Sequence, residues 1–352
     1  VYSGTLRTAL FNMIISQRIF DVEANSVQTL LNESTQEAGM YGDTKLFYST
    51  DILESQDFVN LSEEEKQNVL ATFRPSSITC QSIIIDNARQ INLTVDDPFT
   101  KQAFSDEGAY SQLMAVFLGA MTTTKNLHNA LTYNTFIGTD KNNENGVVST
   151  YEIEVNANDT DSEKGAKIAE GIADLYIALS DASREYTDTK YMRSYDASQL
   201  KMVWNSKHVN MIRNRVLPIL FNDQYVKNSL KDMEQYVLAP RYFGTVSSAT
   251  SSVAGARTLK EIKVANKNYL PGDVLPTSTQ VTANSTYVND STIIGKIMHK
   301  ESVPFLSGFV TTESFRNARA HNTNYYLLWV YNTLEHLVDK PMIEIKLKTV
   351  ST

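Results

Sequence analysis

The chain has 352 residues, of which 42% are hydrophobic and 20% charged, and its formal net charge is −8 at pH 7. A chain of this length exceeds the usual size of one core, so two or three lobes are expected, and the composition is typical of a globular protein. The negative charge argues against a surface built to neutralise phosphates, because DNA binding draws its affinity from clustered Lys and Arg.

Disulfide and membrane chemistry are also constrained. Cys80 is the only cysteine, so neither an intramolecular disulfide nor an all-cysteine metal site can form. The longest apolar runs, 113–121 and 325–331, are far shorter than the ~20 residues that a bilayer-spanning helix needs. We therefore expect a soluble protein without membrane contact.

The N-terminal 55 residues mix apolar and polar side chains without one clean period. Residues 5–20 are compatible with a short helix, and residues 32–43 have the composition of a loop. Apolar stretches of this size are rarely left in water. We therefore predict that this segment packs on neighbouring subunits through Leu6, Leu10, Phe11 and Ile14.

A short helix is predicted next, over residues 61–73. Ser62 is a suitable cap, and the three glutamates after it suit the positive end of a helix. Pro75 ends this helix. Residues 77–97 then contain two β-branched runs separated by "DNAR", which predicts a hairpin with arms of roughly ten residues.

The clearest helix runs from Ser105 to about Phe136. At 1.5 Å per residue its length is on the order of 45 Å. Asp106 and Glu107 lie in its first turn, as the helix dipole favours. Residues at alternating spacings of four and three predict one continuous buried stripe. This stripe contains Leu113, Phe117, Ala120, Thr124, Leu127 and Leu131.

The remaining chain alternates strands and helices. A second amphipathic helix is predicted over 161–186, with Ile168, Ile172, Leu175 and Leu179 on one side. A short strand, a polar turn and a helix follow in 200–214. Other segments are predicted to be extended, namely 147–155, 216–222, 236–244, 292–300, 302–312 and two runs within 324–350.

The sequence contains no recognisable catalytic or ligand-binding motif. No two of its five histidines are four residues or fewer apart, so the helical zinc-binding pair is absent, and no nucleophile elbow or phosphate-binding glycine loop occurs. The turn Asn205, Ser206 and Lys207 lacks a glycine that would let a ligand approach the backbone. We interpret Asn205 or Ser206 as a helix cap and predict no catalytic residue, cofactor or metal.

Three segments resemble a known family. They are "KYMRSYDASQLKMVWNSKHVNMIRN" (190–214), "VLAPRYFG" (237–244) and "ESFRNARAHNTNYYLLWVYNTLEHL" (313–337). Together with the order of the predicted elements, they resemble the Hong Kong 97-type major capsid proteins of tailed bacteriophages. The resemblance is greatest to those of small short-tailed phages of Gram-positive bacteria.

The resemblance implies an α+β fold with an N-terminal arm, an extended hairpin loop, a peripheral domain with a spine helix and an axial domain. The turn at Asn205 then belongs to the axial sheet and has a structural role. The implied divisions are an arm (1–55), a short helix (56–73), an extended loop (74–97), a peripheral domain (98–157), an axial domain (158–300) and return strands (301–352).

The implied function is self-assembly, as hexamers and pentamers, into an icosahedral shell that encloses double-stranded DNA. Portal, scaffold or cementing proteins are possible further partners, direct binding to nucleic acid is expected to be weak or absent, and assembly is expected in the host cytoplasm. Two alternatives remain at this point. One is an encapsulin-like bacterial compartment of the same fold, and the other is an α/β enzyme with an unrecognised site.

The family's best-known member locks its shell with an isopeptide bond from a lysine of the extended loop. Residues 74–97 contain no lysine, since Lys66 and Lys101 lie outside them. A guanidinium stays protonated and is a poor nucleophile. We therefore predict a non-covalent lock to the next subunit through Ile83, Ile84 and Ile85, with an ion pair from Arg89 near the hairpin tip.

Overall fold

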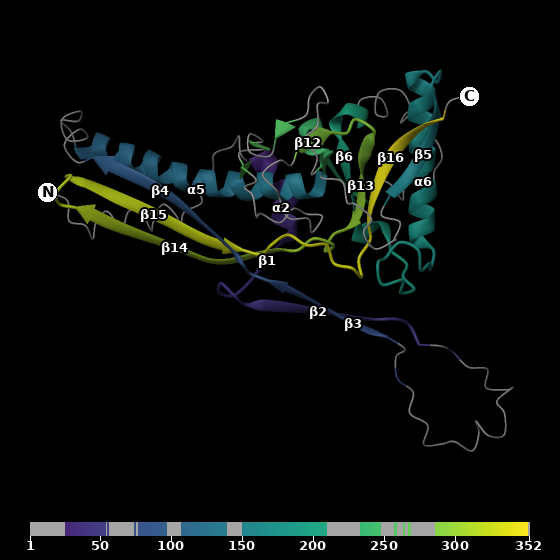
Figure 1. Ribbon diagram of the computed structural model, residues 1–352, viewed down its shortest axis with the longest axis horizontal. Helices are drawn as coiled ribbons and strands as arrows, with labels where there is room; N and C mark the ends of the chain where they lie inside the picture. Colours follow the sequence, from purple (N-terminus) through teal and green to yellow (C-terminus); the bar gives the residue numbers. More distant parts are fainter. Residues whose placement is uncertain are drawn as a thin grey trace, which may run out of the picture.

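The computed structural model describes residues 25–53, 55, 74, 77–96, 107–138, 150–209, 233–247, 257–258, 263–264, 267–268 and 286–350. The described chain has an elongated body with two layered parts, and a two-stranded hairpin projects from it (Figure 1). Among these residues, none of the helices combines the length and the apolar character of a membrane span.

The first part of the body is a long helix that lies along a narrow sheet (Figure 1). The sheet has the order β1-β14-β15-β4, with β1 parallel to β14 and the other neighbours antiparallel. Its elements are α5 (Glu107–Gly138), β1 (Thr35–Glu37), β4 (Asn87–Asp96), β14 (Phe305–Asn317) and β15 (Asn322–Tyr331). The long helix is confirmed to within two residues at each end.

The buried side of α5 differs from the predicted stripe. Phe117 is 37% exposed, whereas Leu118 and Met121 are buried. Leu127 is half-buried against the core, and Leu131 is buried. The early part of α5 has apolar residues on nearly every side, so periodicity alone could not identify the side that meets the sheet.

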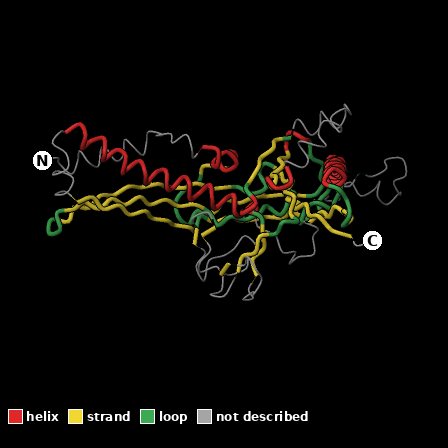
Figure 2. The backbone as a smooth tube through the Cα atoms, turned by 90° about the horizontal axis from the view of Figure 1, so that it is seen from above, coloured by secondary structure: helices red, strands yellow, loops and turns green. Residues whose placement is uncertain are grey.

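The second part of the body is a five-stranded sheet with the order β5-β16-β13-β6-β7. Helix α6 covers one face, and Figure 2 shows it end-on while α5 lies in the plane of the view, so the two helices point in different directions. These elements are β5 (Thr150–Asn156), α6 (Asp161–Ser180), β6 (Leu200–Asn205), β7 (Glu234–Leu238), β13 (Ile293–His299) and β16 (Met342–Val350).

Helix α6 forms as its sequence predicts, although it ends at Ser180 rather than near 186. Thr160 and Glu163 make a reciprocal capping box at its start. Its predicted apolar side is buried against the sheet through Ile168, Ile172, Leu175 and Leu179. The central strand β13 is buried along its whole length, since a second apolar cluster that includes the end of α5 covers the opposite face.

The projecting hairpin pairs two strands that were not predicted to be partners. They are β2 (Thr44–Thr50) and β3 (Ile78–Ile84), and they are antiparallel from Thr44 opposite Ile84 to Thr50 opposite Ile78. The predicted hairpin within 74–97 is therefore wrong, because β4 pairs with β15 instead. Strand β4 pairs with β15 because this arrangement buries its apolar side chains. Ile91, Leu93 and Val95 of β4 pack into the core that includes α5.

Part of the predicted N-terminal arm belongs to the body. Helix α2 (Asn25–Ser34) packs on α5 and buries Leu30 and Leu31 in the core. The arm therefore has partners within its own chain from residue 25 onward, and the expected loop at 32–43 contains β1. The contacts predicted for Leu6, Leu10, Phe11 and Ile14, and the helix predicted at 61–73, lie outside the described residues.

Short elements complete the described part. Strands β8, β12 and β9 form a three-stranded sheet, and β10 pairs with β11. Their bounds, with those of two short 3₁₀ helices, are η1 (Ala197–Gln199), η2 (Pro240–Tyr242), β8 (Gly244–Ser247), β9 (Arg257–Thr258), β10 (Lys263–Val264), β11 (Lys267–Asn268) and β12 (Thr286–Asn289).

Candidate subunit-interaction surfaces

The polar turn after β6 has a structural role. Asn205 is buried, its side-chain nitrogen donates to the Ile293 carbonyl at 2.9 Å, and its side-chain oxygen accepts from the Lys207 amide at 3.1 Å. His208 Nε2 lies 3.0 Å from the Ser291 carbonyl, and burial lowers the pKa of this imidazole. Both polar groups of Asn205 are therefore used to join β6, β13 and the start of a helix.

Buried charges elsewhere in the body are also paired within the chain. Lys296 and Glu344 are 1% and 2% exposed, and their charged groups lie 3.2 Å apart between β13 and β16. Lys201 Nζ donates to Ser34 Oγ at 2.9 Å, and burial lowers the pKa of Lys201 to about 8. In the part of the chain that the structure describes, no group of three His, Cys, Asp or Glu side chains is placed to hold a metal.

Exposed apolar side chains gather on the hairpin. More than half of the large apolar residues that are exposed in the described ranges lie between residues 40 and 84, on the two strands or beside them. They are Met40, Tyr41, Leu46, Tyr48, Ile52, Leu53, Ile78 and Ile84. Apolar patches on soluble proteins mark interaction surfaces more often than isolated apolar residues do.

The register gives the hairpin two different faces. In an antiparallel pair, residues opposite one another point to the same side of the sheet. Leu46, Tyr48, Ile78 and Ile84 therefore share one face, which we call the outer face, and they are exposed by 49%, 70%, 68% and 47%. Cys80, opposite Tyr48, lies on this face and is exposed.

The inner face of the hairpin lies against its own chain. Ile83 packs with Leu306, Val330 and Leu337, and Phe47 lies beside this cluster. The side chains of Thr79 and Gln81, on the same face, hydrogen-bond to the body. One face of the hairpin is therefore occupied by intrachain contacts, and the apolar groups of the other face remain in water.

The residues predicted for the subunit interface lie in different environments in the structure. Ile83 and Ile85 are buried in this chain's own core, where a neighbouring subunit cannot reach their side chains. Ile84 is on the outer face. Arg89 is not near a hairpin tip: it lies within β4, half-buried, opposite Trp329. These corrections follow from the pairing of β3 with β2 and of β4 with β15.

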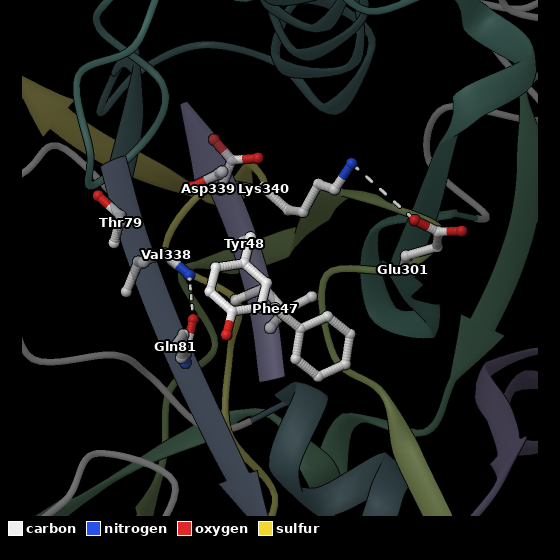
Figure 3. Close-up of a pocket in the computed structure, with 10 residues that line it drawn as sticks. Phe47, Tyr48, Thr79, Gln81, Glu301, Val338, Asp339 and Lys340 are labelled. Atoms are coloured by element: carbon white, nitrogen blue, oxygen red, sulfur yellow. Dashed lines mark hydrogen bonds and ion pairs between the residues drawn. The ribbon is translucent and has the colours of Figure 1, made fainter. Parts of the chain in front are cut away.

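A pocket of about 230 Å³ lies between the hairpin and the turn that precedes β16. Phe47, Tyr48 and Thr79 line it from the hairpin, and Asp339 and Lys340 line it from the turn (Figure 3). At its rim the Lys340 ammonium lies 3.9 Å from a Glu301 carboxylate oxygen. The pocket shows that this part of the hairpin is not closely packed against the body.

The sequence pattern does not indicate that the outer-face residues Leu46, Tyr48 and Ile78 form an interaction surface. The segment 44–50 was assigned to the arm, although Leu46 and Tyr48 alternate with other residues as in a strand. That alternation is short and has no turn signal beside it, since its partner strand begins 28 residues after β2 ends. Only the tertiary pairing identifies this surface.

Solved phage structures share the fold. A chain in the capsid structure of Staphylococcus phage Andhra is 12% identical with a TM-score of 0.58, over 89% of this chain and 83% of that chain. A chain in the structure of the head fiber and inner core protein of native bacteriophage P68 is 11% identical with a TM-score of 0.57, over 90% and 83% of the two chains. A chain in the mature capsid of bacteriophage PhiM1 is 9% identical with a TM-score of 0.51, over 90% of this chain and 86% of that chain.

No curated protein matches the sequence. The sequence profile of the Phi29-like phage major capsid proteins, however, matches residues 5–333, which is most of the chain. The predicted resemblance to tailed-phage capsid proteins is thus confirmed, and the mixed helix and strand architecture agrees with it. The chain belongs to the Phi29-like phage major capsid protein family.

Proposed function

We propose that the outer face of the β2–β3 hairpin joins neighbouring subunits of the capsid shell. As a major capsid protein, the chain forms the shell of a phage virion. The observation that supports the role of the hairpin is its two-faced structure: the inner face is held by the body, whereas Leu46, Tyr48 and Ile78 are exposed. Burying such groups against a second subunit is favourable by about 25 cal/mol per Å² of apolar area.

The N-terminal residues are proposed as a second contact. Leu6, Leu10, Phe11 and Ile14 are apolar, and the chain after them enters α2, whose Leu30 is part of the core. A deletion that tests this contact should therefore end before α2. Removing residues 1–20 is expected to abolish shells while leaving folded subunits, and normal shells from the shortened chain would contradict the proposal.

The proposed cargo is double-stranded DNA, in a shell of hexamers and pentamers that assembles in the host cytoplasm with portal, scaffold or cementing proteins. A net charge of −8 gives the subunit no general attraction for phosphates, so packaging must be driven by a motor. Free subunits are expected to bind DNA weakly or not at all at physiological salt. Family membership favours this phage shell over an encapsulin-like compartment and over an enzyme.

The proposed lock between subunits stays non-covalent, but on different grounds. The segment from the start of β2 to the end of β3, residues 44–84, includes Lys45 and Lys66, so the absence of lysine from residues 74–97 does not exclude a covalent lock. Arg89 is removed from the lock because of its position in β4. The apolar outer face now supports the proposal, and particles boiled in detergent are expected to release monomers rather than a ladder of covalent oligomers.

The decisive experiment replaces apolar groups of the outer face. Leu46→Ser combined with Ile78→Ser is expected to leave folded, unassembled subunits, as judged by circular dichroism and analytical ultracentrifugation. Ser82→Ala is the matched control, because Ser82 lies opposite Leu46 on the same face and the change removes no apolar surface. Shells of normal yield from the double variant, seen by electron microscopy, would reject the proposed role of the hairpin.

A further inference from the structure

The hairpin is attached to its own body by two chemically different sets of contacts. At its base, near the start of β2 and the end of β3, the attachment is apolar. Ile83 and Ile85 are buried with Leu306, Val330 and Leu337. Buried aliphatic contacts of this kind depend little on salt, because no charge takes part in them. The base is therefore a fixed point.

The middle of the hairpin is attached by one side-chain amide. Gln81 Nε2 donates to the His336 carbonyl at 2.9 Å, and Gln81 Oε1 accepts from the Val338 amide at 3.0 Å. The turn that it contacts also carries Leu337, so this attachment belongs to the same fixed region. Beyond Gln81, the pocket that Tyr48 and Lys340 line lies between the hairpin and this turn (Figure 3).

The far end of the hairpin is held by the loop between α6 and η1. Asp51 forms an ion pair with Arg184, and its carboxylate also accepts from the Met192 amide at 3.0 Å. Arg193 donates to the Thr50 carbonyl at 2.9 Å. We call this loop, residues 181–196, the α6 loop.

Two further contacts complete the attachment. Thr79 and Tyr191 join their hydroxyls at 2.5 Å. Arg193 also pairs with Asp339 at 2.9 Å, so the α6 loop is tied to the turn beside the hairpin. Every described contact of this set is polar, and the apolar residues at this end, Tyr48, Ile52 and Ile78, are exposed.

The electrostatics suit a contact that can open. The Arg184 side chain is 48% exposed, whereas Asp51 is largely covered. Hydrogen bonds from Arg184 and then from the Met192 amide lower the pKa of Asp51, so its carboxylate is ionised at neutral pH. When these polar contacts open, water can take the place of the lost partners, so the net cost of each contact is modest. Opening the base would instead expose the apolar groups of Ile83 and Ile85.

We propose that Thr50, Asp51 and Thr79 form a polar latch with the α6 loop, and that the hairpin pivots about its apolar base when this latch opens. The latch is a property of one subunit. Its consequence, that a single chain can direct its hairpin toward neighbours in non-identical positions, rests on the proposed function of the outer face. A pivot of this kind moves Leu46 and Ile78 without disturbing the core.

Cys80 provides the test, because it is exposed on the hairpin and is the only cysteine. A spin label there is paired with a second label at Glu170→Cys, an exposed position on α6. Pulsed electron paramagnetic resonance then measures the distance distribution in full-length subunits before assembly. The parent is expected to give one narrow distribution in low salt, because the polar contacts of Thr50, Asp51 and Thr79 hold the far end of the hairpin.

Combining Arg184→Ala with Arg193→Ala is expected to broaden or shift this distribution in low salt. Hydrogen exchange of the Met192 amide, which donates to Asp51 in the closed latch, is expected to quicken at least about threefold, with the amides at the base unchanged. Thr79→Val tests the hydroxyl contact without removing a charge. Lys348→Ala is the control, since it removes an exposed ion pair with Glu152 in the body.

Two results would overturn the latch. One is an unchanged distance distribution in the double arginine variant, and the other is equal broadening in Lys348→Ala. Circular dichroism establishes that each variant is folded before the comparison. The Leu46→Ser and Ile78→Ser variant separates the two proposals: it keeps a narrow distribution if the latch is right, whether or not it assembles.

Discussion

The body and the hairpin of this protein use the same kinds of residue with opposite results. Strand β13 places seven consecutive residues in the core between two covered faces. Strand β2 has the same length, but Leu46 and Tyr48 remain exposed because no described residue covers the outer face. The difference indicates which apolar surface serves folding and which remains available for assembly.

The two regions also treat charge differently. In the body, Lys296 and Glu344 are removed from water, and the Glu344 carboxylate pairs with Lys296 and with Lys346. At the far end of the hairpin, Arg184 is half-exposed, so its side of the ion pair with Asp51 stays in contact with water. Buried pairs are costly to break, whereas exposed pairs contribute little. We therefore expect perturbations of the body to change folding, and perturbations of the hairpin to change how subunits meet.

The largest expected effect is the loss of the buried acid in the body. Glu344→Ala removes a buried carboxylate that pairs with Lys296 at 3.2 Å and with Lys346 at 3.0 Å, and breaking a buried pair typically costs about 3–5 kcal/mol of unfolding free energy. Urea unfolding measures this change. Glu152→Ala is the control, because Glu152 pairs with Lys348 in water, and a similar loss in both variants would contradict the distinction between buried and exposed pairs.

The second largest loss of unfolding free energy is expected from a leucine in the apolar core that includes α5. Leu131→Ala should reduce the free energy of unfolding by roughly 2–5 kcal/mol, the usual range for a buried leucine. Leu127→Ala should lose less than Leu131→Ala, since Leu127 is only half-buried. Chemical denaturation of the two variants checks their order, and the reverse order would show that the buried side of α5 is assigned incorrectly.

The pH dependence of folding stability is expected to be an effect of intermediate size. Burial, and then the nearby Lys340, lower the pKa of His299 to about 4, while Glu301 donates its amide to the neutral ring at 3.1 Å. Between the ordinary histidine pKa of about 6.5 and this value, only the unfolded chain binds the proton. Stability should therefore fall by about 1–3 kcal/mol as pH decreases through this window.

His299→Asn tests this dependence, because its side-chain oxygen can accept the same amide hydrogen bond without titrating. The variant should show a flatter stability profile between pH 6.5 and 4. His321→Asn is a matched control: His321 is exposed, and its positive φ of 50° is a conformation that asparagine tolerates. Equal flattening in both variants would remove His299 as the cause.

The smallest effect on folding is expected in the hairpin. Leu46→Ala should change the free energy of unfolding of the subunit by less than about 1 kcal/mol, since exposed substitutions seldom cost more. The same change should lower the yield of shells, because it removes apolar area from the proposed contact. Parallel measurement of unfolding and of shell yield separates the two roles, and a large loss of subunit stability would place Leu46 in the core.

The sequence by itself determined the elements whose signals are local. The apolar period of residues 161–186 predicts α6, and the long helix α5 is placed to within two residues. A cap at Asn205 or Ser206 is likewise predicted after a buried strand, and the Asn205 side chain accepts from the Lys207 amide. In these cases neighbours along the chain supply both the hydrogen bonds and the periodicity, so no distant partner is needed to identify them.

Only the tertiary structure decided which segments meet. Strands β3 and β4 were found in the sequence, but their partners β2 and β15 lie far from the places where a short turn would put them. The outer face of the hairpin therefore has no local signal in the sequence, and the prediction that Ile83 is an interface residue is wrong, since Ile83 is buried in its own chain. The physical reason is that pairing is selected by the apolar surface it buries: Ile91 and Leu93 gain a core from α5, whereas Leu46 and Ile78 stay exposed among the described residues.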